Sequence, residues 1–147
     1  MIRARSWIAA LGALLLSLGA HAEQFLDQGD YRIHYNALNT TALTPDVARR
    51  FGVTRSRQEA LLVLSPQRRD EQGHYRPVPA QGEGRARSLL GHVTPLKLRP
   101  VREGDAHYLV ASFDVLDGEF LNLELKVLPA GANAPIALSF KQQFYRD

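Results

Sequence analysis

The stretch that decides the fold is Glu119-Phe120-Leu121-Asn122-Leu123-Glu124-Leu125-Lys126-Val127-Leu128. Between Leu121 and Val127, every second residue is aliphatic and the residues between are polar or charged. Side chains alternate between the two faces of a β-strand, so this pattern buries one face and hydrates the other. The segment therefore predicts a strand in a sheet that is packed on one side.

The same period of two recurs along the chain. It is present in Tyr31 to Leu38, in His107 to Leu116 and in Ile136 to Phe144. Ala60 to Leu64 is continuously apolar, as expected of a strand that is buried on both faces. We expect about seven to nine short strands, because turn residues separate these segments at the spacing of an antiparallel sandwich.

One of these turns and one helix can be predicted locally. Asp117-Gly118 suits a tight hairpin turn, because such turns need positive φ angles. The helix begins after Thr44, a capping residue, and ends at Gly52. We expect it to plug one end or edge of the sandwich through Val47 and Phe51.

These features predict an all-β fold, an antiparallel immunoglobulin-like β-sandwich with one short helix. Residues 23–147 form its single domain. Residues 1–22 have the pattern of a signal peptide, with Arg3 and Arg5, an apolar run from Trp7 to Leu18, and Ala20-His21-Ala22. We expect export to the periplasm and no membrane span after cleavage, because the run is shorter than the roughly 20 residues that cross a bilayer.

Charge and cysteine content narrow the function classes. The chain has 18 Lys and Arg against 15 Asp and Glu, and Arg3 and Arg5 leave with the signal peptide, so the remainder is nearly neutral. We therefore expect no nucleic-acid partner. The chain has no cysteine, which excludes disulfides, thiolate metal sites and a lipid-modified cysteine.

Motifs for catalysis and metal binding are missing from the sequence. There is no Gly-x-Ser-x-Gly nucleophile elbow, and the histidines after residue 22 lack the short spacings that commonly build a metal site. A site assembled from different strands, such as His34 with His107 and a carboxylate, remains an alternative. We expect no enzyme activity, no resident metal and no cofactor.

Two regions are candidates for recognition. The first is the polar segment around the end of the first long strand, with His34, Tyr35, Asn36, Asn39 and Arg55 as its binding residues. Asn and Thr side chains at a strand end can equally well satisfy backbone groups. The second is the segment from Tyr75 to Pro79, where two prolines predict an edge strand.

The function that fits best is a non-enzymatic accessory module that binds another envelope protein or a peptide. The exposed edge near Tyr75 to Pro79 is the expected contact, because an extended peptide can add to an open sheet edge. The alternative is a periplasmic protein that binds a small ligand or a metal through the region from His34 to Asn39.

Several separated motifs, taken in order, resemble the exported bacterial proteins grouped as domain of unknown function 4426. They are His34-Tyr35-Asn36-Ala37-Leu38-Asn39-Thr40, Leu43-Thr44-Pro45-Asp46-Val47-Ala48, Gly52-Val53-x-Arg55-Ser56, Leu89-Leu90-Gly91, Arg102-Glu103-Gly104-Asp105-Ala106-x-Tyr108 and Phe140-x-Gln142-x-Phe144-Tyr145. The resemblance implies a small periplasmic protein of proteobacteria and brings no activity, substrate or catalytic residue. His107 stands where the resemblance leads us to expect an aliphatic residue.

Overall fold

The computed structural model describes residues 24–146. The predicted signal peptide, residues 1–22, lies outside the described residues. The strands are β1 (Phe25–Gln28), β2 (Tyr31–Asn39), β3 (Glu59–Arg69), β4 (Tyr75–Pro77), β5 (Ala80–Ser88), β6 (Val93–Leu96), β7 (Arg99–Glu103), β8 (Ala106–Asp114), β9 (Glu119–Pro129) and β10 (Ile136–Phe144). A 3-10 helix, η1 (Thr40–Ala42), and one α-helix, α2 (Pro45–Phe51), lie between β2 and β3.

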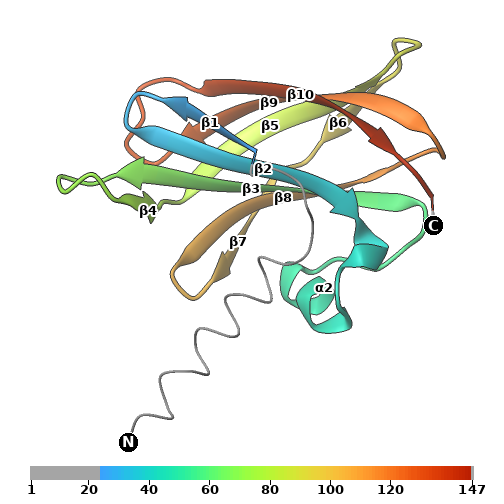
Figure 1. Cartoon of the computed structure of the whole chain (residues 1–147), viewed down its shortest axis with the longest axis horizontal. Coiled ribbons are helices and arrows are strands. Elements are labelled where there is room, and N and C mark those ends of the chain that lie inside the picture. Colours follow the sequence, from blue (N-terminus) through green and yellow to red (C-terminus); the bar gives the residue numbers. More distant parts are fainter. Residues whose placement is uncertain (1–23, 147) are drawn as a thin grey trace, which may run out of the picture.

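These strands form two antiparallel sheets that pack face to face (Figure 1). Sheet A has six strands in the order β1-β2-β3-β8-β7, and β4 is attached to β3. Sheet B has four strands in the order β10-β9-β5-β6. The predicted all-β sandwich is confirmed, with more strands than expected because β1 and β6 are too short to show a periodic pattern.

The core lies between the sheets and is built by the alternation seen in the sequence. On β9 the inward side chains are those from Leu121 to Val127 at every second position, and all are buried. Sheet A contributes Ile33, Ala37, Ala60, Leu62, Leu64, Leu109, Ala111 and Phe113 to the same cluster. Burial of these apolar surfaces is the main favourable term in folding, since the chain has no cysteine to form a disulfide.

The helix covers the outer face of sheet A, and the prediction that it plugs an end or edge is wrong. Ala48 packs with Leu61 of β3 and Val110 of β8, on the side of the sheet that faces away from sheet B (Figure 1). This explains why β3 is apolar on both faces. The predicted caps are present, because Thr44 Oγ1 accepts a hydrogen bond from the Val47 N–H at 3.3 Å and Gly52 has φ 65°.

The turn at Asp117-Gly118 does not form the hairpin that its sequence suggested. β8 belongs to sheet A and β9 to sheet B, so the turn carries the chain from one sheet to the other. Only Gly118 has positive φ there, 74°, whereas the common two-residue hairpin turn needs positive φ at both central residues. The Asp117 carboxylate instead accepts a hydrogen bond from the Arg146 N–H at 2.9 Å.

Side chains close one side of the sandwich. β1 pairs only with Tyr31 to His34, so the rest of β2 has no strand beside it on that side within residues 24–146. There Gln142 Nε2 of β10 donates to the Ala37 carbonyl at 2.8 Å, and Asn39 Nδ2 donates to the Tyr145 carbonyl at 2.8 Å. These two bonds fasten the edge of sheet A to the edge of sheet B.

Candidate functional site

The five residues of the predicted polar surface do not form one surface. Tyr35 faces the core, where its ring lies 4.7 Å from the Phe140 ring. Asn36 is exposed on the opposite face of sheet A, because neighbouring residues of a strand point to opposite sides. His34 shares that outer face, and its Nε2 lies 3.2 Å from Gln67 Oε1.

The remaining two residues of that set bond to backbone carbonyls. Asn39 bonds to the Tyr145 carbonyl, and Arg55 Nη2 donates to the Thr41 carbonyl at 3.0 Å. These contacts match the alternative in which polar side chains at a strand end satisfy backbone groups. Recognition of a ligand by the five residues stays a prediction.

The pair of histidines weighed as metal ligands is also separated. His107 lies on the same face of β8 as buried Leu109, whereas His34 lies on the outer face of sheet A. Within residues 24–146, no three His, Asp or Glu side chains are grouped closely enough to hold a metal ion.

The predicted edge from Tyr75 to Pro79 does lead to a cleft. β4 pairs with β3 alone in the described part of the chain, so it is an edge strand. Beside it opens a hollow of about 250 Å³, which we call the proline cleft. Its walls are Pro66, Pro79, Ala80, Pro100, Val101, Arg102, His107 and Tyr108.

Pro66 explains why the cleft forms at this place. β8 pairs with β3 from Glu59 to Leu64, and the next position on that side of the ladder is Pro66. The N–H and C=O of one residue point to the same side of an antiparallel strand, and the Pro66 carbonyl accepts from the Val78 N–H at 3.1 Å. Proline has no N–H, so β3 lacks a donor where β8 would continue.

The two strands then separate. β3 takes β4 as its new partner, while the first residues of β8 pair only with β7. The free end of the β7–β8 hairpin diverges from β3, as Figure 1 shows. The proline cleft is the space between this hairpin end and the segment that follows β4.

The chemistry of the cleft is apolar with a basic rim. Three prolines offer apolar surface, and Arg102 and His107 come from paired positions on β7 and β8. No carboxylate lines it. Arg102 Nε is bonded to the Gly104 carbonyl at 3.1 Å, whereas the His107 side chain makes no hydrogen bond within residues 24–146. The site therefore suits an apolar side chain next to an acceptor group.

Ion pairs and stacked rings hold β4 beside this cleft. The Arg32 guanidinium lies 4.3 Å from the Phe25 ring centroid and 4.1 Å from that of Tyr75. The same group bonds to the Asp27 carboxylate at 2.7 and 2.9 Å, and these bonds hold the pKa of Asp27 below its usual value. Tyr75 is thus packed on an arginine that is itself fixed in place.

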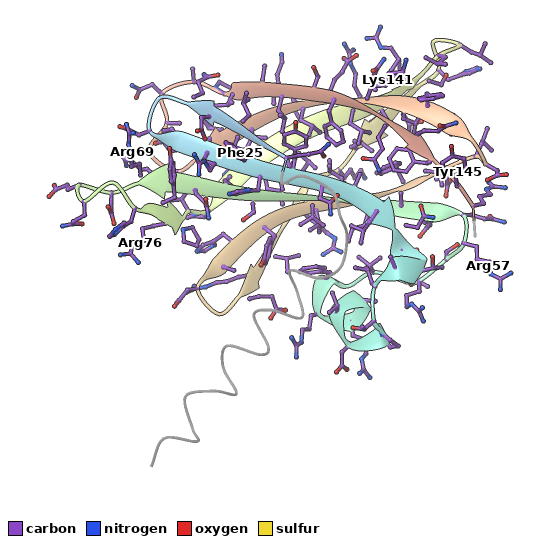
Figure 2. The ribbon with its side chains drawn as sticks, viewed as in Figure 1. Phe25, Arg57, Arg69, Arg76, Lys141 and Tyr145 are labelled. Carbon is purple, nitrogen blue, oxygen red and sulfur yellow. The ribbon has the colours of Figure 1, made fainter. Side chains whose placement is uncertain are left out.

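The loop between β3 and β4 is organised by Asp70. Its Oδ1 accepts from the backbone N–H groups of His74 at 2.8 Å and Gln72 at 3.0 Å, and its Oδ2 accepts from Arg76 Nε at 3.1 Å. The His74 N–H is the first cause of a lowered pKa at Asp70, and the Arg76 side chain adds to it. Figure 2 shows Arg69 and Arg76 at the same end of the molecule.

Asp70→Ala is expected to loosen β4 without unfolding the domain. Amide hydrogen exchange at Gln72 and His74 should accelerate about tenfold, because both N–H groups lose their acceptor. Glu71→Ala is the matched control and should leave these rates unchanged. The same loosening is expected in the wild type on acidification. Because the pKa of Asp70 is lower in the folded protein than in the unfolded chain, its stabilising contribution is complete above the unfolded-state pKa of about 3.9. That contribution is lost as the pH falls through the folded-state pKa. Equal exchange in both variants would contradict this role.

A second hollow lies on the outer face of sheet B. It has a volume of about 520 Å³ and spreads over β5, β9 and β10, where Ala137 and Ser139 are small. Its floor carries charges of both signs, including the pair of Arg85 Nε and Glu124 Oε2 at 2.7 Å. Such a surface, with oppositely charged side chains paired across neighbouring strands, is typical of a sheet face that is exposed to water.

The fold and the cleft define a small two-sheet sandwich protein with an open strand edge. In the part of the chain that the structure describes, no helix is long and apolar enough to cross a membrane. The chain belongs to the family described as domain of unknown function (DUF4426), whose model matches residues 25–147. The resemblance inferred from the separated motifs is thereby confirmed.

Solved structures support the fold. A DUF4426 family protein from Pseudomonas aeruginosa PAO1 is 33% identical, with a TM-score of 0.73, and the match covers 85% of this chain and 96% of that one. FetP from uropathogenic Escherichia coli strain F11 is 10% identical, with a TM-score of 0.59 and coverage of 87% and 99%. A copper-bound FetP variant is 9% identical, with a TM-score of 0.60 and coverage of 85% and 96%. The FetP likeness shows the fold alone. A comparison with curated proteins finds no match.

Neither Arg102 nor Tyr108 was singled out by sequence reasoning as a binding residue. Both lie in a motif that carries the family resemblance. Their residue types alone gave no sign of a cleft. One local signal was His107, which departs from the aliphatic residue expected at that position. A second signal was Pro66, a proline inside a long apolar strand.

Proposed function

We propose that this protein is a non-enzymatic accessory module of the periplasm that binds an extended segment of another envelope protein. The segment would lie along the free side of β4 and place one side chain in the proline cleft. The observation that carries the proposal is the position of an apolar cleft directly beside an open strand edge.

The size of the cleft favours a side chain over a free small molecule. Pockets for drug-sized ligands have volumes of about 300 to 1,000 Å³ and enclose most of the ligand. The proline cleft, at about 250 Å³, is below that range. In strand addition, main-chain hydrogen bonds give affinity and pockets for alternate side chains give specificity.

The lining also favours recognition over catalysis. General acid–base chemistry needs titratable groups with matched geometry in one cleft. His107 has no carboxylate beside it among the lining residues, and the Arg102 guanidinium offers only hydrogen-bond donors. The periplasmic location is supported by the signal-peptide pattern of residues 1–22.

Site-specific crosslinking in cells tests the proposal. A photo-crosslinking amino acid is placed at Pro79, which is exposed and lines the cleft, and in a second strain at Lys126, on the outer face of sheet B. We expect a discrete protein adduct from position 79 and none from position 126. Pro77→Glu, which adds a charge to the β4 edge, should reduce the adduct about tenfold or more, because charged side chains on an edge strand oppose the addition of another strand.

Ser139→Glu is the matched control, since it adds the same charge to a sheet B surface and should not change the adduct. An adduct that persists in Pro77→Glu, or a yield at position 79 no greater than at position 126, would contradict the proposed function. The second candidate is a metal-binding protein, and copper is the metal to test because a FetP variant that shares the fold is copper-bound. It predicts that copper raises the melting temperature, and that result without a position-79 adduct would replace our proposal.

A further inference from the structure

The hairpin between β5 and β6 ends in two exposed leucines. Leu89 is 64% exposed and Leu90 is 88% exposed. The turn that presents them is ordered by hydrogen bonds, because Ser88 O accepts from the Gly91 N–H at 3.0 Å and Ser88 Oγ accepts from the His92 N–H at 3.1 Å. Gly91 adopts φ 87°, which closes the turn. The ordered turn therefore keeps both leucines exposed at the end of the hairpin.

Other exposed apolar side chains gather at the same end of the sandwich. Ser88 is paired with Leu121 and Glu119 with Phe144, so the hairpin tip lies beside the start of β9 and the end of β10. Large exposed hydrophobic residues in the described chain number eight, and six belong to this end. The six are Leu89, Leu90, Val93, Leu116, Phe120 and Tyr145. Single exposed leucines are ordinary, but a cluster marks a binding surface.

Cations flank this cluster on the outer face of sheet B. Arg87, Asn122 and Lys141 form one row across three strands. Lys141 Nζ lies 5.0 Å from the Phe120 ring centroid. Glu124, in the next row, forms ion pairs with Arg85 at 2.7 Å and with Arg87 at 3.1 Å. Three cations thus face one carboxylate on this part of the sheet.

The other acids at this end lie off the outer face of sheet B. Asp114 is on sheet A, at the end of β8. Asp117 lies in the turn before β9, where it accepts from the Arg146 N–H. Glu119 Oε2 accepts from the Leu116 N–H at 3.0 Å, and its side chain points to the face of β9 opposite Phe120. The sheet B side of the tip is therefore the positively charged side.

We propose that this tip, made of Leu89, Leu90, Val93 and Phe120, docks on a lipid bilayer that carries anionic headgroups. A convex projection with two leucines suits the yielding interface of a membrane, which accepts apolar side chains without a matching pocket. Arg87 and Lys141 are placed to contact headgroup phosphates. Few apolar groups take part, so the docking is reversible.

This inference goes beyond the proposed function and does not rest on it. Figure 2 shows Arg69 and Arg76, which flank the β4 end, on the opposite side of the molecule from Tyr145. A protein docked through the tip would keep the proline cleft directed away from the lipid.

Vesicle sedimentation tests the proposal with protein purified from the envelope fraction of cells that express the full chain. Vesicles contain either phosphatidylglycerol with phosphatidylethanolamine or phosphatidylcholine alone. We expect sedimentation with the anionic vesicles, and about a tenfold or greater loss of binding for the double variant Leu89→Ser and Leu90→Ser. Leu128→Ser, an exposed leucine of β9, is the matched control and should bind like the wild type.

A second double variant separates charge from insertion. Arg87→Gln with Lys141→Gln should weaken binding only to anionic vesicles, and about 0.5 M salt should do the same to the wild type. All variants should melt as the wild type does, because the altered side chains do not belong to the core. Wild-type protein that stays in the supernatant, or equal binding by the serine variant, would overturn the proposal. Light scattering that shows a dimer lost only in the serine variant would assign the tip to a second copy instead.

Discussion

Replacing Leu123 with alanine is expected to lower the free energy of unfolding by about 2 to 5 kcal/mol. Leu123 is 0% exposed and lies on β9, between β5 and β10, where it is paired with Ala86 and Phe140. The truncation removes apolar contacts and leaves a cavity that a close-packed core fills only in part. Urea denaturation followed by circular dichroism measures the loss.

Leu128→Ala on the same strand is the control. Leu128 is 37% exposed and points to the other face of sheet B, so its truncation should cost about 0.5 kcal/mol or less. Similar losses for the two variants would show that the inner face of β9 does not carry the core. The predicted contrast is large because a domain of this size has only about 5 to 15 kcal/mol of net stability.

Thr40→Val is expected to cost about 2 to 4 kcal/mol. Thr40 is the buried polar residue of the described chain, at 0% exposure. Its Oγ1 donates to the Ser56 carbonyl at 2.8 Å and accepts from the Ser56 N–H at 2.8 Å. Valine keeps the shape but leaves a buried donor and a buried acceptor without partners, and such groups are costly.

Thr40→Ser distinguishes the hydroxyl from the methyl group. Serine can make both bonds, so it should recover most of the lost stability, and exchange at the Ser56 amide should return close to the wild-type rate. A serine variant as unstable as the valine variant would show that packing of the methyl group is the dominant contribution. Because Thr40 begins η1, the bonds also tie this turn to the segment after the helix.

Elements with one buried face could be predicted closely from the sequence. The segment expected from Tyr31 to Leu38 is β2, and the segment from Glu119 to Leu128 is β9, each with its end within one residue of the prediction. The helix followed from its caps, because capping is decided by neighbouring residues. Local patterns are sufficient where the burial of one face determines the structure.

What could not be predicted depends on contacts between distant segments. The period of two places Tyr35 and Asn36 on opposite faces of the strand, yet it does not say that Tyr35 meets Phe140 on the other sheet. Asp117-Gly118 has the composition of a hairpin turn, and the assignment of β8 and β9 to different sheets overrides it. The proline cleft forms because Pro66 lies just beyond the end of the pairing between β3 and β8. Local sequence does not show which distant segments pair.

The bonds from Gln142 to Ala37 and from Asn39 to Tyr145 affect how copies of the protein can associate at high concentration. A bare β2 would present a ready template on which further copies could stack into fibrils. By occupying the Ala37 carbonyl and drawing the end of β10 against β2, the chain shields that template with its own side chains. This stretch of the sheet A edge is thus protected against edge-to-edge polymerisation.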